Sequence, residues 1–391
     1  MIKITNKQNC CGCSACAQRC PKQCISMQAD SEGFLYPKVD TEVCINCHLC
    51  EKVCPVINPS ESRTPLGVYA AKNANDKVRM ASSSGGIFTC LAQRVLAEGG
   101  VVFGARWDDN WNVVHDYTES VNELPQFRSS KYLQSVIGDN YLKAERFLKA
   151  GRKVMFTGTP CQIAGLRHFL RKDYDNLLAV EVICHSVPSA GVWQQYLHEK
   201  LSTLGWHKSD ISRITFRSKT TGWKSYSFLI ENHQGQTFTE LGGENTFMRG
   251  FLADLYTRPS CSACPAKQLK SGSDITLGDF WGIGTLNPAL DDDKGLSAIM
   301  VNTAKGKDAL YNIGVELHSV SYEAVTQRNP ALVTPVAVQP KRTIFFQQDG
   351  RTIEAKVKKL AKPPFSLRVF ISRIIHQCVP NALIEKIKSL K

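Results

Sequence analysis

Residues 10–21 read CCGCSACAQRCP, and residues 44–55 read CINCHLCEKVCP. Both stretches contain the spacing C-x-x-C-x-x-C-x-x-x-C followed at once by proline, which is the spacing of bacterial ferredoxins with two 4Fe-4S clusters. The pattern predicts that residues 1–56 form an α+β, ferredoxin-like domain that binds two such clusters. The cysteines that fit the pattern are Cys10, Cys13, Cys16 and Cys20 in the first run, and Cys44, Cys47, Cys50 and Cys54 in the second.

The order of these cysteines also predicts which of them share a cluster. In two-cluster ferredoxins the first three cysteines of a run bind one cluster, and the cysteine before proline binds the other. A zinc site or a disulfide network fits less well, because zinc usually takes four ligands from two separated pairs. Cys11 and Cys24 lie outside the pattern and are interpreted as buried or spare thiols. We therefore expect one cluster on Cys10, Cys13, Cys16 and Cys54, and the other on Cys44, Cys47, Cys50 and Cys20.

Cysteine usage predicts the cellular compartment. Ten of the 16 cysteines in this chain of 391 residues fall within the first 54 residues. The N-terminus, MIKITNKQ, has no apolar leader, and no stretch reaches the ~18 uncharged apolar residues of a spanning helix. We expect a cytoplasmic protein, since clustered cysteines in a reducing compartment bind metal more often than they form disulfides.

The formal net charge of +13 indicates a basic protein. Two oxidised clusters of about −2 each would leave it basic. Such a surface suits a ferredoxin or another acidic redox partner, although scattered surface lysines explain the charge equally well. We expect no nucleic-acid partner.

The remaining sequence predicts a second domain and a tail. Residues 57–66 are polar and proline-rich, which is typical of a linker. Residues 67–340 alternate between apolar runs and helical patterns, which indicates an α/β domain with a mixed sheet. Residues 341–391 form a basic amphipathic tail that either lies on an anionic membrane surface or, as we expect, packs on its own domain. We predict strands in GVYAAKN, GGVVFGARW, KVMFTGTP, LLAVEVICHS, SRITFRSK, SYSFLIEN, QTFTEL, SDITLGDFWG and GLSAIMVNT, and helices in TPCQIAGLRHFLRK and TAKGKDALYNIG.

The turn at residues 82–86, SSSGG, precedes an apolar helix. Free backbone amides at a helix start favour a phosphate or an electron-rich ring edge. The alternative is a simple N-cap by Ser84. The chain has neither G-x-G-x-x-G after a strand nor a Walker A loop, which argues against a standard Rossmann dinucleotide site and against a nucleoside triphosphatase.

Four more cysteines lie at strand ends and loops of the predicted sheet, where they can converge. They are consistent with a third 4Fe-4S cluster, but two of them can equally be inert buried thiols and the C-x-x-C pair a redox pair or half a zinc site. His185, beside one of them, is interpreted as a hydrogen-bond donor. The four cysteines are Cys161, Cys184, Cys261 and Cys264.

Seven segments together with the ferredoxin pair make nearly the whole chain resemble the family of coenzyme F-420 hydrogenase/dehydrogenase beta subunits. The seven segments are SSSGGIFT from Ser82, SSKYLQS from Ser129, FTGTPCQIAGL from Phe156, CHSVPS from Cys184, RPSCSACPAK from Arg258, DITLGDFWG from Asp274 and DDDKGLSAIMVNT from Asp291.

The resemblance implies that the second domain binds FAD, and it strengthens the expectation of a third cluster. It implies an iron–sulfur flavoprotein oxidoreductase that links a small-molecule hydride donor or acceptor to one-electron centres. The alternative is a non-catalytic electron-transfer subunit, and relatives near surface-polysaccharide genes suggest a link to polysaccharide biosynthesis. The residues that become candidate flavin contacts are Ser83, Ser84, Gly85, Gly86, Lys131, Tyr132 and Ser135.

Overall fold

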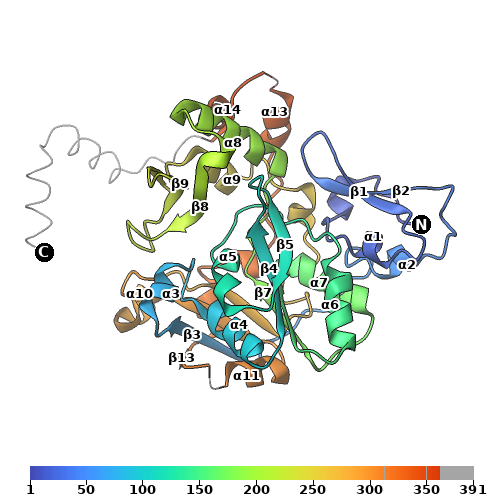
Figure 1. Cartoon of the computed structure of the whole chain (residues 1–391), viewed down its shortest axis with the longest axis horizontal. Coiled ribbons are helices and arrows are strands. Elements are labelled where there is room, and N and C mark those ends of the chain that lie inside the picture. Colours follow the sequence, from blue (N-terminus) through green and yellow to red (C-terminus); the bar gives the residue numbers. More distant parts are fainter. Residues whose placement is uncertain (312, 349, 362–391) are drawn as a thin grey trace, which may run out of the picture.

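The computed structural model describes residues 1–361 except residues 312 and 349. The N-terminal cysteine-rich domain contains one antiparallel pair of strands, β1 (Ile25–Ala29) and β2 (Leu35–Val39), and two short helices, α1 (Ala15–Arg19) and α2 (Leu49–Lys52). It lies at one side of the molecule (Figure 1). Strand β2 lies within the segment GFLYPKVD, residues 33–40, which connects the two cysteine runs.

The two cysteine runs fold alike. Helix α1 begins after Ser14 and helix α2 after His48, and both of these residues adopt the left-handed conformation, with φ of 62° and 58°. Each lies four residues beyond the first cysteine of its run. This repeated turn brings the third cysteine of each run back toward the first two.

Residues 57–64 are exposed, and residues 59–65 form neither helix nor strand. They lead into an eight-stranded sheet with the order β13-β3-β12-β11-β7-β6-β4-β5. The four central strands β11, β7, β6 and β4 run parallel, and the flanking pairs are antiparallel, which confirms the predicted mixed sheet. The strands are β3 (Gly67–Asn73), β4 (Val101–Trp107), β5 (Val113–Thr118), β6 (Val154–Gly158), β7 (Leu177–Val182), β11 (Ile275–Asp279), β12 (Ser297–Val301) and β13 (Val315–Ser319).

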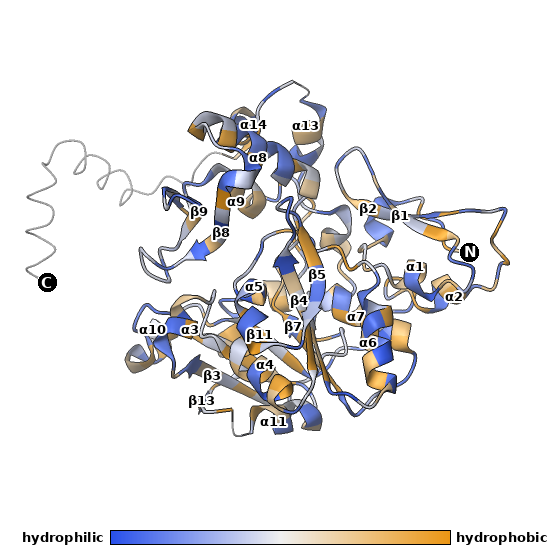
Figure 2. Ribbon diagram, in the orientation of Figure 1, coloured by the Kyte–Doolittle hydropathy of each residue, from blue (hydrophilic) through white to orange (hydrophobic). Residues whose placement is uncertain are grey.

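Helices cover both faces of this sheet because successive side chains of a strand point to opposite sides. Val101 and Phe103 of β4 pack under α6 (Asn140–Lys149) and α7 (Pro160–Leu170), whereas Val102 packs against α4 (Ile87–Ala97). Figure 2 shows α4 and α6 with one apolar and one polar side, as helices on a sheet surface should have. The shorter helices are α3 (Asp76–Met80), α5 (Leu124–Phe127), α10 (Ile283–Leu286), α11 (Ala304–Leu310) and α12 (Tyr322–Thr326).

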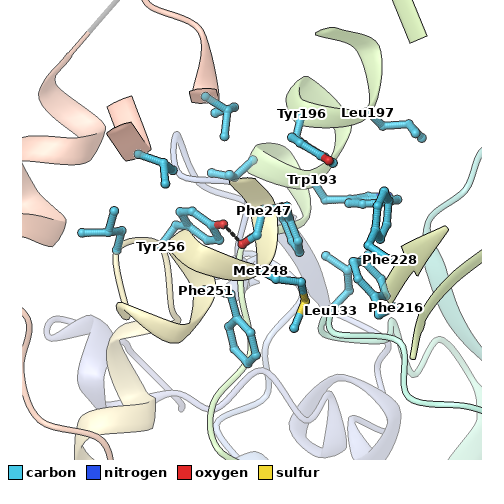
Figure 3. Packing of buried hydrophobic residues seen from close by; sticks show 14 of the residues in the cluster. Leu133, Trp193, Tyr196, Leu197, Phe216, Phe228, Phe247, Met248, Phe251 and Tyr256 are labelled. Atoms are coloured by element: carbon cyan, nitrogen blue, oxygen red, sulfur yellow. Dashed lines mark hydrogen bonds between the residues drawn. The ribbon is translucent and has the colours of Figure 1, made fainter. Parts of the chain in front are cut away.

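A second, three-stranded antiparallel sheet of order β10-β9-β8 packs against α8 and α9 through an aromatic cluster (Figure 3). Trp193 and Phe216 lie at its centre, both fully buried, with ring centroids 5.3 Å apart. Leu133 and Phe251 belong to the same cluster. The elements are β8 (Ile211–Ser218), β9 (Ser227–Asn232), β10 (Thr237–Leu241), α8 (Ala190–Leu204), α9 (Thr246–Leu252), α13 (Lys341–Gln347) and α14 (Ile353–Leu360).

The first part of the expected C-terminal tail is folded. Helices α13 and α14 contribute Phe345, Ile353 and Val357 to the aromatic cluster. Residues 362–391, for which membrane contact was the alternative to the expected packing on the domain, lie outside the described residues. Within residues 1–361, no helix has the length and hydropathy needed to cross a bilayer.

The aromatic cluster yields a stability prediction. Phe216→Ala removes a fully buried ring and should lower the free energy of unfolding by about 3–5 kcal/mol. Leu252→Ala, at a position that is 53% exposed on α9, should change it by less than about 0.5 kcal/mol. Denaturant unfolding followed by tryptophan fluorescence measures both, and equal effects of the two variants would contradict this packing.

Candidate functional site

The cysteines of the N-terminal domain form two groups, an inner and an outer one. Cys10, Cys13, Cys16 and Cys54 are all buried. Burial, together with the neighbouring thiols of Cys10 and Cys54, raises the pKa of Cys16 to about 12. The structure therefore brings together the four thiols that the spacing assigns to one cluster.

The outer group surrounds a small pocket near the surface. Cys20, Cys44, Cys47 and Cys50 line this pocket, and Cys47 is exposed. Cys24 lies beside them, with its sulfur 3.4 Å from that of Cys20. These are the four thiols expected to share the second cluster, and they reach the protein surface.

The four remaining candidate cysteines also converge. Cys161 lies in the first turn of α7, Cys184 follows β7, and Cys261 and Cys264 lie in and just after the 3-10 helix η4 (Pro259–Ala263). All four line one pocket together with Cys11. The position of Cys161 is set by the predicted start of α7, where Thr159 is the N-cap residue, Pro160 is the first helical residue and the Thr159 amide donates to Gln162 Oε1 over 3.0 Å.

These thiols are held away from water. A hydrogen bond with Cys11, followed by burial, holds the pKa of Cys161 well above its usual range, and burial does the same for Cys184. Among the described residues, no three His, Cys, Asp or Glu side chains are placed to hold a single metal ion. A zinc ion with bonds of about 2.3 Å would need its thiolates roughly 4 Å apart, whereas a four-iron cluster spreads them over four metals.

A cavity of about 300 Å³ lies at the carboxyl ends of the parallel strands β6, β7 and β11. Ligands bind at this edge in open α/β sheets. Of the predicted flavin contacts Gly85 does not line it: its amide donates to Ser297 Oγ over 3.0 Å, and it packs against the backbone of β3. The predicted contacts that do line it are Ser83, Ser84, Gly86, Lys131, Tyr132 and Ser135.

The start of α4 faces this cavity. The helix begins after Gly86, whose φ is 82° and whose position has no side-chain cap, and Gly86, Ile87 and Phe88 all line the cavity. The alternative of an N-cap by Ser84 is wrong, because its hydroxyl donates to the Leu296 carbonyl over 2.7 Å. Uncapped amides with the positive end of the helix dipole make this wall attractive to anions.

Two cations at the cavity make no ion pair with a carboxylate of the described residues. Lys131 donates to the carbonyls of Arg128 and Ser129, at 3.0 and 3.5 Å, and Arg128 donates to Thr89 Oγ1 at 3.1 Å. Burial of the ammonium group lowers the pKa of Lys131 to about 7. Both residues also line an open cleft next to the cavity. An anionic group bound there would neutralise their positive charges.

His115 is a cavity residue that the sequence did not mark. Its Nε2 lies 2.8 Å from the Thr157 carbonyl and its Nδ1 lies 2.7 Å from Ser135 Oγ. Since a carbonyl only accepts, Nε2 carries the proton and Nδ1 accepts from the Ser135 hydroxyl. Gln162 donates to the same hydroxyl at 2.9 Å. Ser135 therefore positions His115, and no sequence signal links the two.

Four further cations of the main domain differ in their distance from the cavity and in their partners. Arg217 is buried and pairs with Asp279 over 2.8 Å and with the Tyr132 hydroxyl over 3.0 Å, beside the cavity. Lys219 is buried and donates to three backbone carbonyls. Lys224 pairs with Asp291 at the surface, and Arg249 donates to the Ala361 carbonyl. Of these four, Arg217 contacts the cavity wall through Asp279 and Tyr132, and Lys219 contacts it through the Ser84 carbonyl.

The cavity and the third cysteine group share a wall. Residues 184–187 line both the cavity and the cysteine pocket. His185 within this wall binds Asp254 through Nε2 at 3.0 Å, in agreement with its interpretation as a hydrogen-bond residue. Cys184 is thus at the border of the two sites.

The third group and the inner group are also adjacent. The Cys11 thiol neighbours the thiols of both Cys13 and Cys161. A Cβ added to Gly165 of α7 would lie 2.8 Å from Cys13 Cβ and 2.9 Å from its sulfur. Helix α7 therefore carries one thiol of the third group at its start and presses against the inner group one turn later.

Comparison with known proteins matches two parts of this chain. Residues 9–58 match the 4Fe-4S dicluster domain, and residues 151–325 match the C terminus of the coenzyme F420 hydrogenase/dehydrogenase beta subunit. The two matches support the resemblance to the family of coenzyme F-420 hydrogenase/dehydrogenase beta subunits that the sequence motifs indicate. It is an iron–sulfur protein of a redox family.

Two relatives are parts of larger oxidoreductases. The F(420)H(2) dehydrogenase of Methanosarcina mazei has a subunit, designated F, that is 24% identical over 195 residues, which are 47% of this chain and 55% of that relative. The chain thus spans about half of that relative's length. A chain of the coenzyme F-420-reducing nickel–iron hydrogenase complex from Methanosarcina barkeri is 17% identical, with a TM-score of 0.46 over 77% of this chain and 91% of that chain.

His115 yields a pH prediction. Its folded pKa of about 4 is below the ordinary 6.5 because of burial, so the unfolded chain binds the extra proton first. Stability from neutral His115 is complete above about pH 6.5 and is lost as the pH falls toward 4, by about 3 kcal/mol in total. In His115→Gln this part of the pH dependence should vanish. Identical pH profiles of the unfolding midpoint in the two proteins would contradict the assignment.

Proposed function

We propose that this protein is an FAD- and 4Fe-4S-dependent oxidoreductase that passes electrons between a small-molecule hydride carrier and a one-electron partner. The observation that supports it most is the wall at residues 184–187, which separates the cavity from a group of four converging thiols. A flavin in the cavity and a cluster among these thiols would be neighbours, with this wall between them.

The cavity residues fit a flavin. A bound flavin supplies the exchange between hydride transfer and single-electron transfer. Lys131, Arg128 and the uncapped start of α4 would hold its anionic part, since they lack carboxylate partners among the described residues. His115, kept neutral by burial, offers an uncharged wall with a fixed tautomer.

The thiols fit three clusters in series. Bound 4Fe-4S clusters supply one-electron transfer. Cys161, Cys184, Cys261 and Cys264 would hold the one nearest the cavity. Cys13 and the rest of the inner group would hold the next, because Cys11 lies between Cys13 and Cys161 and Cys13 packs on α7 at Gly165. The outer group, with Cys47 exposed, would exchange electrons with the partner.

The surface near the outer group favours a protein partner, which also keeps a second candidate function open. Val43 and Ile45 beside Cys47 are 46% and 57% exposed. Apolar side chains around an exposed redox site suit a transient contact with a ferredoxin or another acidic redox protein. If the hydride chemistry resides in another protein of a complex, this chain is an electron-transfer subunit. We place either form in the cytoplasm, where thiols stay reduced; the link to polysaccharide biosynthesis stays a prediction.

Iron content tests the third cluster. Anaerobically purified protein should contain about 12 iron atoms per chain and one flavin. Cys264→Ala should lower iron to about 8 and keep the flavin. Cys90→Ser, on α4 and outside all three groups, should leave both unchanged. Unchanged iron in Cys264→Ala would exclude the third cluster, and absence of bindable flavin would exclude the enzyme.

Lys131 should make flavin binding pH-dependent. Its ammonium is charged below the folded pKa of about 7 and attracts an anion, so affinity is highest below pH 7 and is lost as the pH rises. We expect FAD affinity of the deflavinated protein to weaken by more than about tenfold between about pH 6 and pH 9. Lys131→Arg should keep its affinity at high pH, and Lys131→Met should be weak throughout. If FAD affinity of Lys131→Met depended on pH in the same way as that of the wild type, a contact between Lys131 and the flavin would be ruled out.

A further inference from the structure

Arg258 is a buried cation at the boundary between the two domains. Only 1% of it is exposed. Its Nε donates to the Cys10 carbonyl at 2.8 Å, and its two terminal nitrogens donate to Gln134 Oε1 at 2.9 Å and to the Leu35 carbonyl at 2.8 Å. One of them also lies 3.7 Å from Cys10 Sγ. The residue thus reaches from the main domain into the first cysteine run.

No carboxylate of the described residues forms an ion pair with Arg258. A guanidinium keeps its charge in proteins, and an unpaired charge in the interior is costly. The Tyr36 ring, with its centroid 4.5 Å from the guanidinium carbon, and the carbonyl oxygens offset only part of this cost. The remaining negative charge has to come from something else at this boundary.

Two cysteine groups flank the guanidinium. On one side is Cys10 of the inner group. On the other, Arg258 lines the pocket of the third group together with Cys161 and Cys261. The backbone is shaped for this contact: a Cβ on Gly12 would lie 2.7 Å from a terminal nitrogen of Arg258.

We propose that Arg258 is the shared counter-ion of the inner and third clusters and raises the reduction potentials of both. The inference rests on the clusters of the proposed function. Each reduction adds one electron and hence one negative charge to a cluster, and a fixed positive charge beside it stabilises that state more than the oxidised one. Because the guanidinium lies between the two groups, it stabilises the reduced state of the cluster in either group, on both sides of the domain boundary.

The test is a potentiometric titration of the anaerobic holoprotein followed by electron paramagnetic resonance. In Arg258→Gln the midpoints of the inner and third clusters should shift to more negative values by at least ~59 mV, which is a tenfold change for one electron. The outer cluster should shift less. Arg258→Lys keeps the charge and should shift both midpoints by less than Arg258→Gln does.

Arg342→Gln is the matched control. Arg342 also crosses between the domains and lies 5.9 Å from the Phe34 ring, but it pairs with Glu32 and contacts no cysteine. Its loss should leave all midpoints unchanged. Equal midpoints in wild type and Arg258→Gln, or equal shifts in Arg258→Gln and Arg342→Gln, would overturn the proposal.

A second variant covers the case in which Arg258→Gln does not retain iron. Gly12→Ala keeps the charge but forces the guanidinium away from Cys10, so the inner midpoint should fall while iron content stays at the wild-type value. An unchanged inner midpoint in Gly12→Ala would then refute the role of Arg258. Wild-type protein that lacks the third cluster's iron would instead refute the proposed function, so the two failures are distinguishable.

Discussion

The close approach of the first cysteine run to the start of α7 is the contact on which the functional arrangement depends. Gly165 lets Cys13 pack directly on the helix, Gly12 leaves room for the Arg258 guanidinium, and Cys11 joins the thiols of Cys13 and Cys161. Each contact crosses from one domain to the other. Without them the N-terminal domain would carry two metal sites with no short connection to the cavity of the sheet.

This contact places the cavity and the three cysteine groups in one order, from the interior to the surface. The cavity lies at the carboxyl edge of the parallel strands, the third cysteine group lies behind its wall, and the inner and outer groups follow toward the surface. The inner group is the most deeply buried of the three, whereas the outer group reaches the surface at the exposed Cys47. Cations that lack carboxylate partners among the described residues, such as Lys131 and Arg258, place positive charge beside the sites along this line. Acidic groups there would oppose the added electrons.

Local sequence predicted the parts whose structure is locally determined. The cysteine spacing groups the eight N-terminal thiols, and Thr159 with Pro160 sets the start of α7. The convergence of the other four cysteines was one of several readings, because it depends on the order of strands in the sheet. Edge strand β13 was missed because its residues VELHS alternate weakly and none of them is fully buried.

The functional residues that sequence reasoning missed act only through tertiary neighbours. In the sequence His115 is a single histidine in a strand. Its tautomer is fixed by the Thr157 carbonyl and Ser135, which are distant in the chain. In the sequence Arg258 is one of many basic residues. Only the structure shows that it lies beside Cys10 and has no carboxylate partner among the described residues. Ser84 looked like a helix cap, but the turn places its hydroxyl on the Leu296 carbonyl instead.

Anomalous diffraction at the iron edge, from crystals grown without oxygen, tests the central claim most directly. The account predicts three separate four-iron peaks: one among Cys161, Cys184, Cys261 and Cys264, one among Cys10, Cys13, Cys16 and Cys54, and one among Cys20, Cys44, Cys47 and Cys50. Planar density for a flavin should fill the cavity beside Cys184. Iron confined to the N-terminal domain, or a single ion among the third group, would contradict it.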